Sequence, residues 1–373
     1  MPRTQHTSRR RFFGQGQPDR AVSADPTVEP YLVQVGRRAM ACRFQVYLNA
    51  GQHPDAAQTA MTALDEVDRI ESILTVYRAD SKVSVINKTA VDEPVSVGPD
   101  VWELLSLAVQ LHAETGGAFD VTAGPLSEAW GFARRAGRVP SDSELAAARA
   151  KVGSGYLDID QQQQSVRFTR PGVKLNFGGI GKGYALDVSS RLLEADGIGD
   201  FLFHGGRSSV LARGARLASD NARSDDARSD NARSDNARSD NARSDGGWQV
   251  GLIHPQRPQV RLAEVRLRDR ALSTSGSQMQ SFQHQGRRYG HILDPRTGRP
   301  CEGILSVTVL AATAALADAL STALFVMGPD DAAKFCQQHP DIAAILIFPA
   351  AGTSRLEVQA FNLSDTDWKM LDD

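Results

Sequence analysis

The chain has 373 residues, 41% of them hydrophobic and 23% charged, which is enough for one large or two modest domains with a buried core. Its 42 basic and 44 acidic residues nearly cancel, so it lacks the positive balance on which non-specific nucleic-acid binding depends. Cys42, Cys301 and Cys336 stand far apart, which excludes a disulfide framework or a zinc cluster and indicates ordinary thiols. No apolar run approaches the roughly 20 residues of a transmembrane helix.

The first 30 residues predict a disordered arm, because they are polar, contain Pro and Gly, and show no hydrophobic periodicity. Residues 8–13, which include Arg9 and Arg10, resemble a twin-arginine export signal. Residues 14–20 are polar where an apolar segment should follow. A cytoplasmic protein with a basic arm is favoured, and export through the Arg9-Arg10 motif is the alternative.

Folded structure is predicted from about residue 31. Residues 43–48 alternate as a strand, and residues 61–74 and 101–111 carry apolar side chains at helical spacing. Ser141 and Glu144 have the spacing of a capping box before an alanine-rich helix that ends at 152–153. Further strands are expected at 166–169, 173–177, 201–203, 210–212, 248–253, 260–265, 306–311 and 343–348.

Strands with interspersed helices, but without a regular βαβ repeat, predict an α+β fold with mixed or antiparallel sheets and flanking helices. We expect one catalytic domain over residues 31–365. Residues 215–247 interrupt it with low-complexity sequence, including five pentads of the form Asn/Asp-Ala-Arg-Ser-Asp between Asn221 and Asp245. A five-residue period fits neither helix nor strand, so we expect a disordered surface insertion between two strands.

A glycine-rich segment, residues 178–183, follows a predicted strand and precedes a predicted helix. Gly178, Gly179, Gly181 and Gly183 leave the backbone open, and Lys182 adds a positive charge near a helix N-terminus. The segment can therefore cradle phosphate oxygens. A tight strand-to-helix turn would have the same composition, and the spacing matches neither a P-loop nor a Rossmann motif.

Asp318 and Thr322 are four residues apart in a predicted helix, so they lie on one face, opposite the leucines. A carboxylate and a hydroxyl there offer hard oxygen ligands to a small divalent cation. A solvated Asp beside a Thr that bonds back to its own helix is the alternative.

Residues 291–300 read as a strand end and a turn that carries His291 and Asp294, either of which could serve as a general base. Ordinary turn chemistry would explain the same residues. Residues 273–276, Ser-Thr-Ser-Gly, read as a hydroxyl-rich loop without the framing of a nucleophile elbow.

In this order and spacing, these motifs resemble the ApbE family of FAD:protein FMN transferases. The similarity runs from about Met40 to about Gly328 and is interrupted by the insertion. Further family landmarks are residues 74–81 (LTVYRADS) with Asn87, 116–122 (GGAFDVT), 130–132 (WGF) and Gly205-Gly206.

The resemblance implies a T-fold-related domain that uses FAD and Mg²⁺ and moves the FMN half of FAD onto a Thr or Ser of an acceptor flavoprotein, releasing AMP. It assigns Asp318, Thr322 and the Gly181 carbonyl to the metal. It assigns His291 to catalysis and to FAD, with Asp294 the neighbouring candidate base. The residues that it places against FAD, besides the glycine segment, are Met40, Tyr77, Asp120 and Lys182.

Three positions depart from the family pattern. Met40-Ala41-Cys42 replaces a Met-Gly-Thr turn, Asn176 replaces an acidic residue, and Arg207 follows Gly205-Gly206 where an acidic or amide residue is usual. Two alternatives to transfer remain open, a magnesium-dependent FAD pyrophosphatase and a non-catalytic FAD-binding protein.

Overall fold

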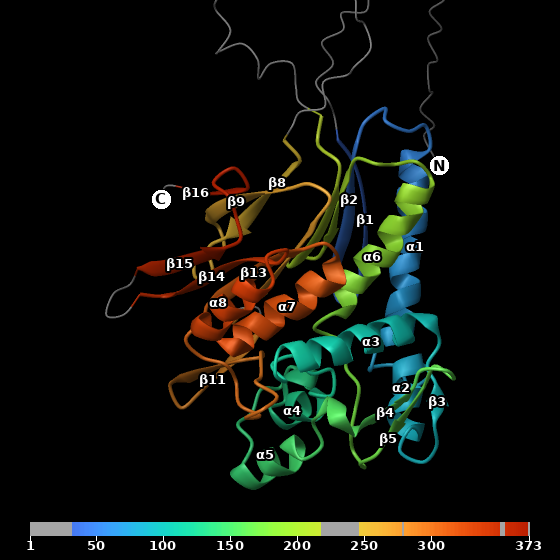
Figure 1. Cartoon of the computed structure of the whole chain (residues 1–373), viewed down its shortest axis with the longest axis vertical. Coiled ribbons are helices and arrows are strands. Elements are labelled where there is room, and N and C mark those ends of the chain that lie inside the picture. The colour runs from blue at the N-terminus through green and yellow to red at the C-terminus, as the bar shows by residue number, and fades with distance from the viewer. Residues whose placement is uncertain (1–31, 218–245, 278–279, 351–354, 372–373) are drawn as a thin grey trace, which may run out of the picture.

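The computed structural model describes residues 32–217, 246–277, 280–350 and 355–371 (Figure 1). The predicted N-terminal arm, 1–30, and the pentads, 221–245, lie outside the described residues, so their disorder stays a prediction. The elements on either side of the insertion are both strands, β7 (Ser209–Arg213) and β8 (Trp248–Ile253), as the sequence predicts.

A sheet of eight strands forms the centre of the fold, in the order β1-β2-β6-β7-β10-β13-β14-β15, and all neighbours are antiparallel. The α+β class with antiparallel sheets is thereby confirmed. Besides β7, the strands are β1 (Leu32–Ala39), β2 (Cys42–Asn49), β6 (Phe201–Gly205), β10 (Ala271–Gly276), β13 (Ser306–Ala311), β14 (Ala343–Pro349) and β15 (Leu356–Phe361).

Both faces of this sheet are covered, because side chains alternate between two hydrophobic clusters. On β6, Phe203 joins the cluster under the helices, whereas Leu202 joins the cluster on the opposite face. The helical layer contains α1 (Ala56–Leu74), α6 (Gly181–Ala195) and α7 (Ala314–Met327) (Figure 1). The opposite layer is a small sheet of β8, β9 (Arg261–Leu267) and β16 (Trp368–Met370). Since Trp368 pairs with Val265, the fold extends past the predicted boundary at 365.

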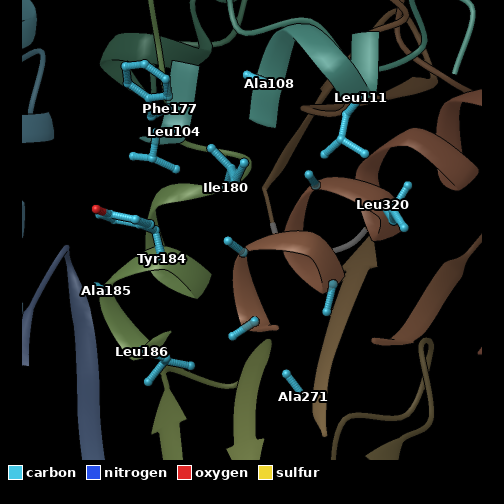
Figure 2. Packing of buried hydrophobic residues seen from close by; sticks show 14 of the residues in the cluster. Leu104, Ala108, Leu111, Phe177, Ile180, Tyr184, Ala185, Leu186, Ala271 and Leu320 are labelled. Carbon is cyan, nitrogen blue, oxygen red and sulfur yellow. The ribbon is translucent and has the colours of Figure 1, made fainter. Parts of the chain in front are cut away.

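Most of the remaining elements gather at one end of the helical layer, where α3 lies across the start of α6 and beside α7, whereas α8 packs against α7, β14 and β15 (Figure 1). Leu104 and Leu111 of α3 pack near Ile180 and Leu320 (Figure 2). These elements are α2 (Lys82–Thr89), α3 (Pro99–Glu114), α4 (Gly124–Ala129), α5 (Asp142–Arg149), β3 (Val95–Ser96), β4 (Leu157–Asp160), β5 (Ser165–Phe168), the hairpin β11 (Ser281–His284) and β12 (Arg287–Gly290), α8 (Pro329–Gln338), and the short η1 (Phe132–Arg134) and η2 (Ser154–Tyr156).

Helices α6 and α7 cap each other at their N-termini. The Asp318 carboxylate of α7 accepts a 2.7 Å hydrogen bond from the backbone N–H of Gly183 in the first turn of α6. The Asp187 carboxylate of α6 accepts 2.8 Å hydrogen bonds from the N–H groups of Ala314 and Ala315 at the start of α7. Burial raises the pKa of Asp187 to about 6. Each helix therefore satisfies orphan backbone donors of the other.

Two predictions from the sequence are wrong. Residues 173–177 form no strand, because the Asn87 side chain takes the place of a partner strand and bonds both the N–H and the C=O of Leu175. Residues 273–276 are not a loop but the end of β10, where Ser273 and Ser275 face α7 and Thr274 bonds Thr308 on the neighbouring strand.

The predicted helix start at residues 141–144 is confirmed. The capping box of Ser141 and Glu144 is present at the start of α5, although the helix ends at Arg149 rather than at 152–153. Cys42, Cys301 and Cys336 are free thiols. Within the described part of the chain, no helix combines the length and the apolar character that crossing a membrane requires.

Gly183 sets how closely α6 approaches α7, and we predict that Gly183→Ala destabilises the protein. A methyl group there would lie 2.0 Å from the Ala314 carbonyl oxygen. Helix propensity alone would favour alanine by about 1 kcal/mol, but the backbone clash should reverse the sign and lower the free energy of unfolding by about 3 kcal/mol.

Chemical denaturation measures the change. Gly199→Ala is the matched control, because its methyl group would meet no atom within 4 Å. A Gly183→Ala protein as stable as the wild type would refute the close contact between the two helices.

Candidate active site

One cavity of about 370 Å³ opens beside the start of α6, between α7, the end of β10 and the segment 118–124. It brings together most of the residues that the sequence singles out. Its lining includes Asp120, Gly178, Gly179, Lys182, His291, Asp318 and Thr322.

Asp318 lies at the closed end of this cavity and is only 3% exposed. Its Oδ1 accepts hydrogen bonds from the hydroxyls of Ser209, at 2.6 Å, and Ser273. These serines are direct cross-strand partners on β7 and β10. Its Oδ2 accepts the bond from Gly183 N–H, and the Lys182 ammonium lies 3.5 Å away. Four donors thus hold a buried carboxylate that would otherwise be costly to desolvate.

Thr322 lies one turn further along α7, on the face that it shares with Asp318. Its hydroxyl is 3.2 Å from Ser275 Oγ and 3.4 Å from the Asp318 carbonyl oxygen. Ser321 donates to the same carbonyl at 2.9 Å. The Thr322 hydroxyl therefore does bond back to its own helix, as the alternative interpretation expects. The same residue still lines the cavity.

The oxygen atoms around Asp318 fit a magnesium ion that is held partly by its substrate. No group of three or more His, Cys, Asp or Glu side chains suited to a metal occurs among the described residues. Mg²⁺ needs no such group, since it commonly binds one or two carboxylates, waters and substrate phosphates. For such an ion, Asp318 would supply the carboxylate and Thr322 a neutral hydroxyl oxygen.

Most amides of the glycine segment are already bonded within the protein. Gly178 N–H donates to Asn176 Oδ1, and the N–H groups of Ile180 and Gly181 donate to the Phe177 carbonyl. Gly183 N–H donates to Asp318. Within the described chain, Gly179 and Lys182 are the residues of this segment whose amides make no such bond. Fewer amides are therefore free to bind phosphate than the sequence predicts.

His291 lines the cavity with a neutral imidazole. Its backbone N–H and its Nδ1 both lie within hydrogen-bonding distance of the Gln280 carbonyl, at 3.0 and 3.1 Å. A carbonyl only accepts, so the proton sits on Nδ1 and the lone pair is on Nε2. Burial lowers the pKa of His291, and the nearby Lys182 charge lowers it further.

The backbone position of His291 depends on the β11–β12 hairpin. The Gln280 side-chain amide donates to the Phe132 carbonyl at 3.0 Å, 148 residues away in sequence. Phe282 of β11 stacks on Tyr289 of β12 and packs against Phe132. These contacts anchor the hairpin beside η1.

Four predicted site residues lie outside the cavity lining. Asp294 is paired with Arg296, with 2.9 Å between Oδ1 and Nε, and organises its own turn. Gly181 is buried against Leu74. Tyr77 is 79% exposed, and Met40 lies in the β1–β2 turn.

Asp120 lines the cavity, but its carboxylate is engaged within the protein. Oδ1 accepts from the Thr122 N–H and hydroxyl, at 2.8 and 2.6 Å, and from the Ser154 hydroxyl. Oδ2 accepts from Ser154 N–H and lies 3.1 Å from His112 Nδ1. Burial opposes ionisation, but the bonds from His112 and Thr122 prevail and lower the pKa of Asp120.

Sequence reasoning missed Ser209, Ser273, Asp187 and Gln280. Only the serines of β10 carried a detectable pattern, since Ser273 and Ser275 alternate with Leu272 and Thr274 as strand residues do. Ser209 becomes visible only when β7 and β10 are known to be neighbours.

We predict that Gln280→Leu raises the pKa of His291 toward its ordinary value. Losing the anchor to Phe132 should loosen the hairpin and admit water to the buried imidazole, which removes the main cause of the lowered pKa. An NMR titration of the His291 ring measures the shift. Gln283→Leu, an exposed position on the same hairpin, is the control. Identical titrations in both variants would refute the anchoring role.

Comparisons with known proteins place this site in a family. The model of the ApbE family matches residues 40–346. The FAD:protein FMN transferase of Escherichia coli is 30% identical over 298 residues, which cover 78% of this chain and 76% of the relative. The transferase of the same name from Vibrio cholerae is 31% identical and covers 75% of this chain and 77% of its own length.

Solved structures agree. The ApbE protein of Thermotoga maritima superposes with a TM-score of 0.73 at 27% identity, over 88% of this chain and 96% of that protein. The apo form of the Pseudomonas stutzeri flavinyl transferase ApbE gives a TM-score of 0.73 at 26% identity, over 90% and 99%. With the matched span and the fold in agreement, the chain belongs to the ApbE family.

Proposed function

We propose that this protein transfers the FMN half of FAD, with magnesium, onto a Thr or Ser hydroxyl of an acceptor flavoprotein and releases AMP. The observation that carries the proposal is the single cavity that joins Asp318 and Thr322 to Lys182 and the base His291. The FAD:protein FMN transferases among its relatives support the same reaction.

The FAD diphosphate would lie between Lys182, the Gly179 amide and the Asp318 face of α7. Lys182 supplies a full positive charge beside the N-terminus of α6, which favours anions. Magnesium bound by Asp318 and Thr322, which both line the cavity, would neutralise diphosphate charge. Asp318 can hold a cation there because Ser209 and Ser273 keep its carboxylate in place.

In the transfer step, the acceptor hydroxyl oxygen attacks the phosphorus on the FMN side of the diphosphate. The bond from that phosphorus to the bridging oxygen breaks, and AMP leaves with that oxygen and its electron pair. His291 Nε2 takes the proton of the hydroxyl. The acceptor is left with a phosphoester bond to FMN, so no oxidant or reductant is required.

The other residues predicted from the sequence take different roles in this proposal. Tyr77, whose ring is largely exposed, would stack on a ring of bound FAD, and Met40 would contact FAD from the neighbouring turn. Asp120 would hold the wall that faces FAD through its bonds to Thr122 and Ser154. Asp294 pairs with Arg296 and stabilises its own turn, so His291 is the base in this proposal.

Incubation with FAD, Mg²⁺ and a Thr-containing acceptor tests the proposal. We expect a fluorescent acceptor band in a denaturing gel and release of AMP. AMP without a labelled acceptor would point instead to the pyrophosphatase, which would use water at the same site. Bound FAD without AMP would indicate a binding protein.

We predict that Asp318→Asn lowers Mg²⁺-dependent AMP release at least about a hundredfold. An asparagine oxygen can still accept from Gly183 N–H, and its amide can donate to Ser209 and Ser273, so the fold should persist while the metal loses its carboxylate. AMP release against Mg²⁺ concentration is the measurement, with circular dichroism as the check on folding. Asp330→Asn on α8 is the control. Undiminished release in the Asp318 variant would exclude the metal assignment.

We also predict that deleting residues 221–245 leaves transfer nearly unchanged. Of the described residues between Ser208 and Ser273, which are 209–217 and 246–272, none lines the cavity, and the deleted segment joins β7 to β8. Acceptor labelling by the deletion variant measures this. Loss of labelling in a folded deletion variant would assign the repeat a part in the reaction.

A further inference from the structure

A second cavity, of about 320 Å³, lies at the β1 edge of the central sheet. We call it the arginine cavity, because it is lined by Gly36, Arg37, Arg38, Cys42 and Arg43. Arg37 points to α1, whereas Arg38 and Arg43 lie on the other face of the sheet, where two positive charges suit a negatively charged group.

Only one of these three arginines is neutralised. Arg37 Nη1 forms ion pairs with Asp65 and, at 2.6 Å, with Asp68, both on α1. Arg38 and Arg43 are exposed and directly opposite each other in the antiparallel register. Neither forms an ion pair within the described residues. Like charges in directly opposed positions destabilise a sheet, so an anion bound between Arg38 and Arg43 would relieve their repulsion.

Gly36 keeps the cavity open. A methyl group on Gly36 would lie 3.4 Å from Arg43 Nε, so the Arg43 side chain extends diagonally over the bare glycine. The guanidinium of Arg43 can therefore present its hydrogen-bond donors beside Arg38. Two such planar groups suit carboxylates, which each accept two parallel hydrogen bonds from an arginine.

Cys42 and Arg43 of the arginine cavity contact the β6–β7 turn, which leads to the active-site cavity. A methyl group on Gly206 would lie 3.1 Å from Cys42 Sγ, and Gly206 N–H donates to the Arg43 carbonyl at 2.9 Å. Arg207, which follows, is exposed, and Ser208 lines the active-site cavity. Burial raises the pKa of the Cys42 thiol. The charge of Lys182 lowers this pKa and the charge of Asp318 raises it, so the thiol lies within electrostatic range of both active-site groups.

We propose that Arg38 and Arg43 dock acidic side chains of the acceptor protein and thereby bring its hydroxyl to the active-site cavity. This inference rests on the proposed transfer reaction, which requires a polypeptide at the mouth of that cavity. The FAD diphosphate is accounted for by Lys182 and Asp318, so the arginines are left for a second anion. A net charge of −2 disfavours nucleic acid as the partner.

The test is a binding assay with the full-length protein, without FAD or magnesium. The probe is a fluorescein-labelled peptide with one threonine flanked by two glutamates on each side, and fluorescence anisotropy reports its affinity. The variants are Arg38→Gln/Arg43→Gln and Arg38→Glu/Arg43→Glu. The matched control is Arg261→Glu/Arg266→Glu, two exposed arginines on β9.

We expect the neutral variant to bind the peptide more weakly than the wild type, the reversed variant at least about tenfold more weakly, and the control within about twofold. The affinity of the wild type should fall as salt rises. Equal binding of a peptide with glutamine in place of glutamate, or unchanged affinity in the reversed variant, would overturn the proposal. Tighter arginine-dependent binding of a 20-nucleotide DNA or of phosphatidylserine vesicles would also overturn it.

Because this assay contains no FAD, its outcome is separate from the test of transfer. If the wild type labels an acceptor but the affinity of the peptide is the same for the Arg38 and Arg43 variants, only the docking inference fails. In the labelling assay, we expect excess acidic peptide to compete with the acceptor and not with FAD. Competition with FAD alone would place the anion site within the FAD site and overturn the inference.

Discussion

Two carboxylates, one buried and one half-buried, each bonded to the start of the other's helix, fix the geometry on which the rest of the structure depends. Asp318 of α7 holds the first turn of α6, and Asp187 of α6 holds the first turn of α7. Gly183 permits this contact, because any side chain there would enter the backbone of α7. The reciprocal bonds bring Lys182 and the glycine segment to the helix face that carries Asp318 and Thr322.

The central sheet also holds the Asp318 carboxylate in place. Ser209 and Ser273 are neighbours across β7 and β10, and both donate to Asp318. A hydroxyl can either donate or accept, so these serines can stay bonded whether or not the carboxylate also holds a cation. A single charged ligand is enough here because a diphosphate would bring its own oxygens.

The sequence predicts features that depend on local spacing and misses those that depend on topology. Asp318 and Thr322 share a helix face by their spacing alone, and the capping box of α5 is a matter of adjacent residues. Residues 173–177 read as a strand because they are extended and apolar, but their partner is the side chain of Asn87. Residues 273–276 have the composition of a loop and are a strand only because β7 and β13 lie on either side.

The β11–β12 hairpin has a consequence for how the enzyme would respond to heat. It is a two-stranded ribbon outside both large layers, and such ribbons are marginally stable on their own. It nevertheless supplies the carbonyl that fixes the imidazole of His291. Local opening of this ribbon costs less free energy than global unfolding. Activity should therefore disappear on warming while the eight-stranded sheet is still intact, and it should return on cooling.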